Sequence, residues 1–443
     1  MKKSNLKRIK IGLVVFSLTM LGTVSVQGKP HEIKPIFIQA HTNNLPHMDL
    51  DMTGPEYQRL LNQLFSFEGF DQELANELQP IFEAGKRNLD WLKFINNHRP
   101  AGQKISLSSK ETQQASPIEE PRRYNPTIIL DKFHDLMGQL PQSIKAVVID
   151  GAPMTINPPM PDKEYMEWGL KIDRSYQLAA RWMTMAPWLN ELEQRRLLDI
   201  RGYYYFSKEE NLAARLTNWL QLDFDTQTRF YGFLVGMCLN NSDFNTPVNT
   251  SERDCKTHLG QAITSAKVNE FYMQNLEGAK ALYDSYFLIP VSRSDVKWNQ
   301  NLEEMHVPFI DPKTDALRHF LADNIQDEFK WNNWHLLLDF LPNGLNTPHL
   351  EFQAGATPHV NAIAGDIITM DANAPLTEYD IQWTIRHEFG HVIGFPDCYV
   401  EFYNRQENVI TSYQLDITNL MCSRRGQMQE RHYTELKRVY GSN

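Results

Sequence analysis

The amino-acid sequence predicts an α+β protein in which mostly helical N-terminal regions precede a C-terminal region that mixes strands and helices. Over most of residues 56–97 and 164–286, apolar residues recur every three or four positions, which is the period of a helix with one buried face. After residue 291, short apolar runs such as 306–310 and 335–340 are separated by polar turns, as expected of strands. A chain of 443 residues is long for one domain, so we expect two or three.

These patterns divide the chain into five parts. We predict a signal peptide at 1–28, a helical region at 29–100, a linker at 101–123, a mostly helical accessory domain at 124–290 and a C-terminal domain at 291–443. The linker is rich in Ser, Gln, Lys and Glu, which is the composition of a protease-sensitive connection. The helical region before it is therefore either a propeptide or a plain accessory module.

The first residues have the pattern of an export signal. A basic stretch that begins at Lys2 precedes the apolar run Ile11–Val26, and Ser25 and Gly28 offer cleavage points. An uncleaved membrane anchor is the alternative, although the run is slightly short to span a bilayer. Since no later run is long enough, we expect a secreted or periplasmic protein without a stable membrane anchor.

The overall charge argues against one class of partner. The net charge is −10, whereas a nucleic-acid-binding protein needs a basic surface. Hydrophobic residues make up 42% of the chain, which is enough for sizeable cores. We therefore expect no nucleic-acid partner, and the sequence points to no particular oligomeric state.

Individual elements follow from the same periodicities. In the accessory domain we expect a short strand at Ala146–Ile149 and then helices at residues 164–188, 191–200, 208–219, 226–239 and 261–286. In the C-terminal domain we expect a strand, a helix and three more strands, at residues 306–310, 314–331, 335–340, 350–352 and 367–370.

The most informative stretch follows these strands and has the pattern HExxHxxGxxD. His387 and His391 are four residues apart, so on a helix both imidazoles face the same side and can bind one metal ion. Glu388 lies beside the first ligand, where it can act as a general base. Gly394 can adopt a positive φ and end the helix, which brings Asp397 back as a third ligand.

The surrounding residues favour a helix here. Thr377 and Asp380 resemble a capping box at its start, and Ile381, Ile385 and Val392 provide a face to bury. The alternative is a core helix whose histidines are only hydrogen-bonded. That alternative requires two His, one Glu, one Gly and one Asp to coincide by chance.

The motif HEFGHVIGFPDCY resembles the active-site helix of metzincin zinc peptidases, in the form whose third ligand is Asp, as in snapalysin-type bacterial enzymes. Asn419–Ser423 is similar to the Met-turn of that family, and its Met421 lies 30 residues beyond His391. Residues 427–440 resemble the closing helix. The resemblance implies one catalytic Zn²⁺, a metzincin-like domain, Met421 as support for the metal site, and hydrolysis of protein or peptide substrates.

The family resemblance assigns two further roles. The last strand before the helix in metzincins often lies along the cleft, and residues 366–371 are our candidate for that edge strand. Tyr399 matches the Tyr of a Pro-Asp-x-Tyr run, where it lines the site, stabilises the oxyanion or simply packs.

Other side chains compete as ligands. Glu401 and Glu407 would suit the gluzincin arrangement, in which a downstream helix supplies the carboxylate, but Gly394 would then have no purpose. His349, His359 and His432 are more typical of surface or core histidines.

Four cysteines fit an exported protein. Proximity in sequence favours the disulfides Cys238–Cys255 and Cys398–Cys422, and the second would connect the loop of Asp397 to the Met-turn. A cysteine switch, in which Cys238 or Cys255 caps the zinc, is the rival hypothesis, but no propeptide motif supports it.

The prediction from these observations is an exported zinc endopeptidase. Two alternatives remain: a binding or adhesion protein with a non-catalytic metal site, and a zinc amidase that acts on cell-wall peptides. A closed structural zinc site needs a fourth protein ligand, and none is evident near the motif.

Overall fold

The computed structural model describes residues 72–105, 121–241, 251–373, 376 and 379–441. The predicted signal peptide, residues 29–71 of the predicted helical region, most of the linker and the predicted N-cap residue Thr377 lie outside these ranges. In the part of the chain that is described, no helix is both long and apolar enough to cross a membrane. The architecture is α+β, as predicted.

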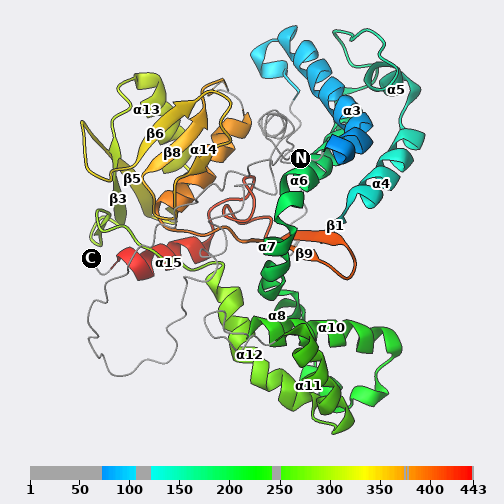
Figure 1. The fold of residues 1–443 in the computed structure, drawn as a ribbon. Coiled ribbons are helices and arrows are strands. Elements are labelled where there is room, and N and C mark those ends of the chain that lie inside the picture. Colours follow the sequence, from blue (N-terminus) through cyan, green and yellow to red (C-terminus); the bar gives the residue numbers. More distant parts are fainter. Residues whose placement is uncertain (1–71, 106–120, 242–250, 374–375, 377–378, 442–443) are drawn as a thin grey trace, which may run out of the picture. The chain divides into compact units, whose positions relative to one another are not determined.

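The C-terminal region contains two mixed sheets and the helix α14 (Tyr379–Val392) (Figure 1). The first sheet has the order β2-β3-β5-β4, and β3 runs parallel to β5. The second has the order β6-β8-β7, with β6 parallel and β7 antiparallel to β8. The strands are β2 Lys297–Asn299, β3 Glu304–Ile310, β4 Lys330–Trp331, β5 Trp334–Leu341, β6 His349–Gln353, β7 His359–Val360 and β8 Ile367–Asp371.

Burial alternates along β3, as the period of a strand requires. Met305, Val307 and Phe309 are fully buried, whereas their neighbours are half-buried. These side chains belong to one hydrophobic cluster with Ile385 and Phe389 of α14. The sheet and the motif helix therefore share a single core, which holds the helix in place.

One predicted strand has a different place in its sheet. Residues 366–371 were expected at an edge, but β8 lies between β6 and β7 and is therefore the central strand. The short strand β7 forms the edge on one side, and β7 also contacts α14. The prediction was wrong because strand order depends on pairings between distant residues, which hydrophobic periodicity does not encode.

The helix predicted at residues 314–331 is shorter than expected. An α-helix, α13, covers Asp315–Leu321, a π-helical turn covers Ala322–Gln326, and Lys330–Trp331 is already strand β4. The helix expected at residues 427–440 is present but begins three residues later, as α15 (Glu430–Tyr440).

Helices dominate the region before residue 290. They are α3 Gln72–Asn97, α4 Pro126–Gln139, α5 Gln142–Val148, α6 Asp162–Met185, α7 Leu189–Gln194, α8 Arg201–Phe206, α9 Leu212–Thr217, α10 Phe224–Asn240, α11 Glu252–Thr264 and α12 Val268–Ser285, with 3₁₀ turns at Ala101–Gln103, Ala186–Trp188, Arg195–Leu198 and Trp219–Gln221. The expected strand Ala146–Ile149 is wrong, because its residues belong mostly to α5. A four-residue apolar run is too short to separate a strand from a buried helical turn.

These helices form two groups with separate cores. The first group, α3 to α7, buries residues such as Leu78, Trp91 and Ile172. The second group, α8 to α12, buries the aromatic residues Phe206, Phe230 and Phe271 in a core of its own.

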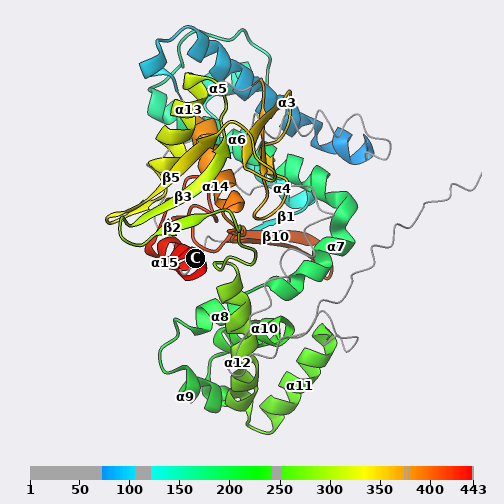
Figure 2. The same cartoon turned by 90° about the vertical axis from the view of Figure 1, so that its left-hand side faces the viewer.

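A three-stranded sheet connects the first helical group to the C-terminal region. Its order is β1-β10-β9, and all pairs are antiparallel. Strand β1 (Arg122–Tyr124) precedes the helices α4 to α12, whereas β9 (Tyr399–Asn404) and β10 (Val409–Gln414) follow the HExxH motif. Figure 2 shows β1 beside β10. Tyr403 and Ile410 of this hairpin belong to the core of the first helical group.

This packing leads to a prediction about the linker. We expect that one cut within residues 106–120, at an inserted protease site, leaves residues 72–105 bound to the rest of the protein. Helix α3 buries Leu78, Ile81, Trp91 and Ile95 among the other helices of its group, and burial of each side chain of this size stabilises by roughly 1.5–3 kcal/mol. Size-exclusion chromatography of the cut protein should show one peak that contains both fragments.

The control is the same column run in denaturant, where the fragments must separate. Release of the N-terminal fragment in native buffer would contradict the expectation and would favour a removable propeptide.

Candidate metal centre

Helix α14 and the turn after it bring three ligating side chains together. His387 Nε2 lies 3.2 Å from Asp397 Oδ1, and His391 Nε2 lies 3.3 Å from the same oxygen. All three ligand atoms are within 4.8 Å of one another, and this is the only such group among the residues that the structure describes. The group joins the two predicted histidines with the predicted third ligand.

The turn that returns Asp397 to the helix depends on Gly394. Its φ is +100°, a value that L side chains rarely adopt, and a Cβ atom at this position would lie 2.4 Å from the carbonyl oxygen of Val291. Both the conformation and the close packing therefore require glycine. The helix ends here, as the motif predicts.

Each imidazole is oriented by a backbone carbonyl. His387 Nδ1 lies 2.9 Å from the oxygen of Leu420, and His391 Nδ1 lies 2.8 Å from the oxygen of Phe395. A carbonyl oxygen only accepts hydrogen bonds, so Nδ1 of each ring donates. In the neutral rings Nε2 is then unprotonated and turned toward Asp397, which is the state that binds a metal ion.

The donor set fits Zn²⁺. Two imidazole nitrogens and one carboxylate oxygen are ligands that zinc accepts, and catalytic zinc sites commonly have three protein ligands and one open position. The histidines are buried, whereas the side chain of Asp397 is 26% exposed, so the group is reached from the side of Asp397. Burial lowers the pKa of His391, but the Asp397 carboxylate more than offsets this, and the pKa is raised.

Glu388 comes from the same helix, next to the first histidine. Its side chain is fully buried. The neighbouring residues Ile385 and Phe389 of α14 belong to the hydrophobic core, which fixes the position of this helical turn. A carboxylate beside a metal ion and within an enclosed site is suited to proton transfer.

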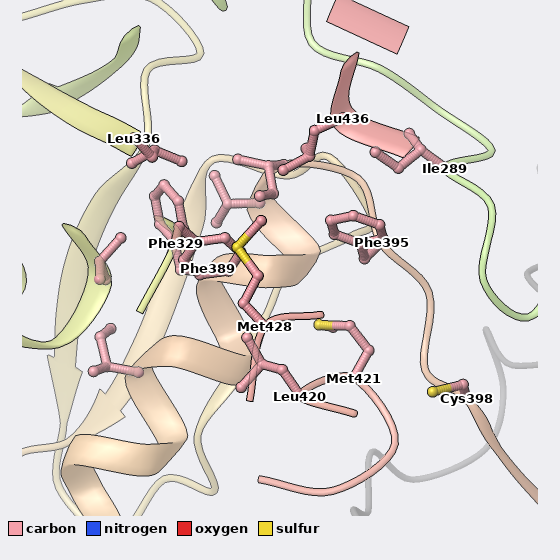
Figure 3. Packing of buried hydrophobic residues seen from close by; sticks show 14 of the residues in the cluster. Ile289, Phe329, Leu336, Phe389, Phe395, Cys398, Leu420, Met421, Met428 and Leu436 are labelled. Carbon is pink, nitrogen blue, oxygen red and sulfur yellow. The ribbon is translucent and has the colours of Figure 1, made fainter. Parts of the chain in front are cut away.

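Met421 packs under the helix between the two histidines. A Cβ atom on Gly390 would lie 2.2 Å from the sulfur of Met421, so only glycine leaves room for this contact. Figure 3 shows Met421 and Leu420 beside the helix that carries Phe389, in one buried cluster. Met421 therefore packs directly against the helix that carries His387 and His391.

Both predicted disulfides are confirmed. Cys238 is bonded to Cys255, and Cys398 to Cys422. The second bond joins the residue after Asp397 to the residue after Met421, and the amide of Cys398 also donates to the oxygen of Met421 at 3.0 Å. The cysteine-switch hypothesis is therefore wrong for this state of the protein, because Cys238 and Cys255 bind each other.

The competing carboxylates have other partners. Glu401 is buried in an ion pair with Arg181, and Glu407 forms an exposed ion pair with Arg123. Neither belongs to the ligand group, which contains Asp397 instead.

The remaining histidines and Tyr399 also lie outside the ligand group. His349 Nε2 lies 3.4 Å from Glu351 Oε1, and His359 Nδ1 lies 2.8 Å from the carbonyl oxygen of Thr357. His432 is buried. Tyr399 is half-buried at the first position of β9, opposite Gln414, and its role stays a prediction.

One supporting residue had no signal in the sequence. The guanidinium of Arg293 donates to the carbonyl oxygens of Ala364, Gly365 and Asn346. The amide of Ala364 in turn donates to the oxygen of His391 at 2.8 Å. Arg293 thereby fixes the loop that follows β7 against the end of the motif helix. The three residues that supply these carbonyl oxygens lie 53 to 72 residues away, beyond the reach of local patterns.

Comparison of the chain with protein-family models, with curated proteins and with solved structures found no significant match.

Proposed function

We propose that the protein is an exported zinc-dependent endopeptidase. The observation that carries the proposal is the convergence of His387, His391 and Asp397 at ligand distances, with Glu388 on the same helix. The residues that support each ligand add to it, because hydrogen bonds to Nδ1 and a packed floor under the site are what a metal centre requires. The resemblance to metzincin peptidases gives the reaction class.

The chemistry divides between the ion and the chain. Zinc, when bound, supplies Lewis-acid polarisation of the scissile carbonyl and lowers the pKa of water. Glu388 takes the proton of the attacking water and then delivers it to the leaving amine. Tyr399 is a candidate for stabilising the oxyanion. The peptide itself can pair with the edge strand β7, which contacts α14 and runs antiparallel to β8.

Two other functions remain as alternatives. A binding or adhesion protein with a structural metal would need a fourth protein ligand, and the described residues near the group offer none. It would also gain nothing from Glu388. A zinc amidase that acts on cell-wall peptides would use the same centre, and only the substrate separates it from an endopeptidase.

Zinc content of the purified protein tests the metal site. We expect one equivalent of zinc in the wild type and a large loss in Asp397→Ala, because two imidazoles alone hold zinc weakly. Elemental analysis of both proteins, purified in parallel, gives the answer. Asp315→Ala is the matched control, since this aspartate is exposed on α13.

Each outcome has a clear meaning. A wild type without zinc would contradict the peptidase and leave a binding role. Full zinc in Asp397→Ala would place the third ligand elsewhere and contradict the Asp-type centre. Two hydrolysis assays, one on casein and one on isolated cell walls, then distinguish the activities. An endopeptidase cleaves casein, whereas an amidase cleaves only the cell-wall peptides.

A further inference from the structure

A buried hydrogen-bond network lies behind the metal centre. His432, on the first turn of α15, is only 3% exposed, and Asn419 of the Met-turn is 1% exposed. His432 Nε2 lies 2.9 Å from Asn419 Oδ1, and the same oxygen accepts the amide of Met421 at 2.8 Å. Asn419 Nδ2 donates to Gln429, which in turn donates to Asp416 and Thr418.

The direction of these hydrogen bonds is fixed by one backbone amide. The amide of Gln429 donates to His432 Nδ1 at 2.8 Å, so this nitrogen must be the acceptor. In the neutral ring the proton is then on Nε2, which donates to Asn419. Burial lowers the pKa of His432 to about 3, so the ring is neutral at physiological pH. Both lone pairs of Asn419 Oδ1 are used, one by Met421 and one by His432.

The network reaches both imidazole ligands. Asn419 holds the turn in which Leu420 presents its carbonyl oxygen to Nδ1 of His387. On its other side, the ring of His432 packs edge-on against Phe395, with centroids 5.2 Å apart. The carbonyl oxygen of Phe395 accepts the hydrogen bond from Nδ1 of His391. One histidine therefore contacts the two segments that orient the two ligands.

We propose that His432 is a positioning residue of the metal centre, which acts through Asn419 on His387 and through Phe395 on His391. The inference rests on the proposed zinc site. Residues that orient metal ligands typically contribute a factor of roughly 10–100 to metal affinity. His432 would thus raise the affinity for zinc without touching the ion.

Two substitutions separate the effect of the hydrogen bonds of His432 from the effect of its ring packing. His432→Phe keeps an aromatic ring against Phe395 but can neither accept from Gln429 nor donate to Asn419. His432→Gln keeps an acceptor and a donor, and glutamine is a favoured residue at this third position of a helix. The control is Ser251→Ala, which removes the capping box of α11 far along the chain from the motif.

The measurements are zinc affinity, by competition with a chelator, and the absorption spectrum of the protein loaded with Co²⁺. We expect His432→Phe to bind zinc roughly 10- to 100-fold more weakly and to change the Co²⁺ spectrum. His432→Gln should stay within about tenfold of the wild type, and Ser251→Ala should match it. The melting temperatures of the metal-free proteins measure the stability lost with the cap of α15 or of α11, independently of any effect on zinc affinity.

Specific results would overturn the proposal. Wild-type affinity in His432→Phe, with a melting temperature lowered as in Ser251→Ala, would make His432 a helix cap only. If His432→Phe does not fold, ¹H–¹⁵N correlation spectra of the wild type decide instead, since a proton on Nδ1 at neutral pH contradicts the network and a proton on Nε2 supports it. A wild type that binds no zinc would overturn the proposed function and this inference together.

Discussion

Replacement of Glu388 by alanine is expected to lower the rate of peptide hydrolysis by at least roughly 10²- to 10⁴-fold, while the protein keeps its zinc. The three ligating atoms come from His387, His391 and Asp397, so Glu388 is not needed to hold the ion. In the proposed mechanism its carboxylate moves the proton from water to the leaving amine. Casein hydrolysis and zinc content, measured on the same preparation, check both halves of this expectation.

Two further variants make the test sharp. Glu388→Gln keeps the shape of the side chain and removes only its basicity, so it should be as inactive as Glu388→Ala. Glu270→Ala changes an exposed glutamate on α12 and should be fully active. Hydrolysis at the wild-type rate in Glu388→Gln would contradict the proposed mechanism, even if zinc is present.

The second large effect is expected at the ion pair between Arg181 and Glu401. The side chains of Arg181 and Glu401 are 3% and 1% exposed, and two hydrogen bonds of 2.5 and 2.8 Å join them. The hydroxyl of Tyr124 donates a further hydrogen bond to Glu401 at 2.7 Å. Arg181→Met leaves the Glu401 carboxylate buried without its cation, which costs about 3–5 kcal/mol of unfolding free energy. Denaturant unfolding followed by fluorescence measures this loss.

The double variant Arg181→Met/Glu401→Met is the control. With both charges removed, no buried charge is left alone, so it should be more stable than Arg181→Met. If both variants lose the same free energy, the effect comes from packing rather than from charge.

The same pair makes stability depend on pH. Burial raises the pKa of Glu401, but Arg181 and the hydrogen bond from Tyr124 outweigh burial, and the pKa is lowered on folding. The stabilising contribution is therefore complete above the unfolded pKa of about 4.3 and is lost as the pH falls through the folded pKa. Glu401→Gln lacks this contribution, so its stability should fall less on acidification than that of the wild type.

The convergence of His387, His391 and Asp397 was predictable because its information is local. His387, Glu388 and His391 are placed by one helical turn, and Gly394 and Asp397 by the turn that ends the helix. The same holds for Cys398–Cys422 and Cys238–Cys255, whose partners are only 24 and 17 residues apart. Short sequence separations leave few alternatives, so spacing alone is informative.

Long-range partners could not be predicted in this way. Arg181 and Glu401 are 220 residues apart, and no pattern in the sequence around one of them predicts the other as its partner. Strand β1 has only three residues, too few for a period to show. His432 looked like any core histidine until its two nitrogens could be assigned to Gln429 and Asn419.

We expect the sheet that pairs β1 with β10 and β9 to form late in folding. Tyr124 and Glu401 are 277 residues apart, and a loop of that length must close before they meet. The first helical group is held mainly by contacts within the group and can form early, but Tyr403 and Ile410 complete its core only when the last part of the chain arrives. We therefore expect the hairpin β9–β10, which follows the loop of Asp397, to pack in its final place only late in folding.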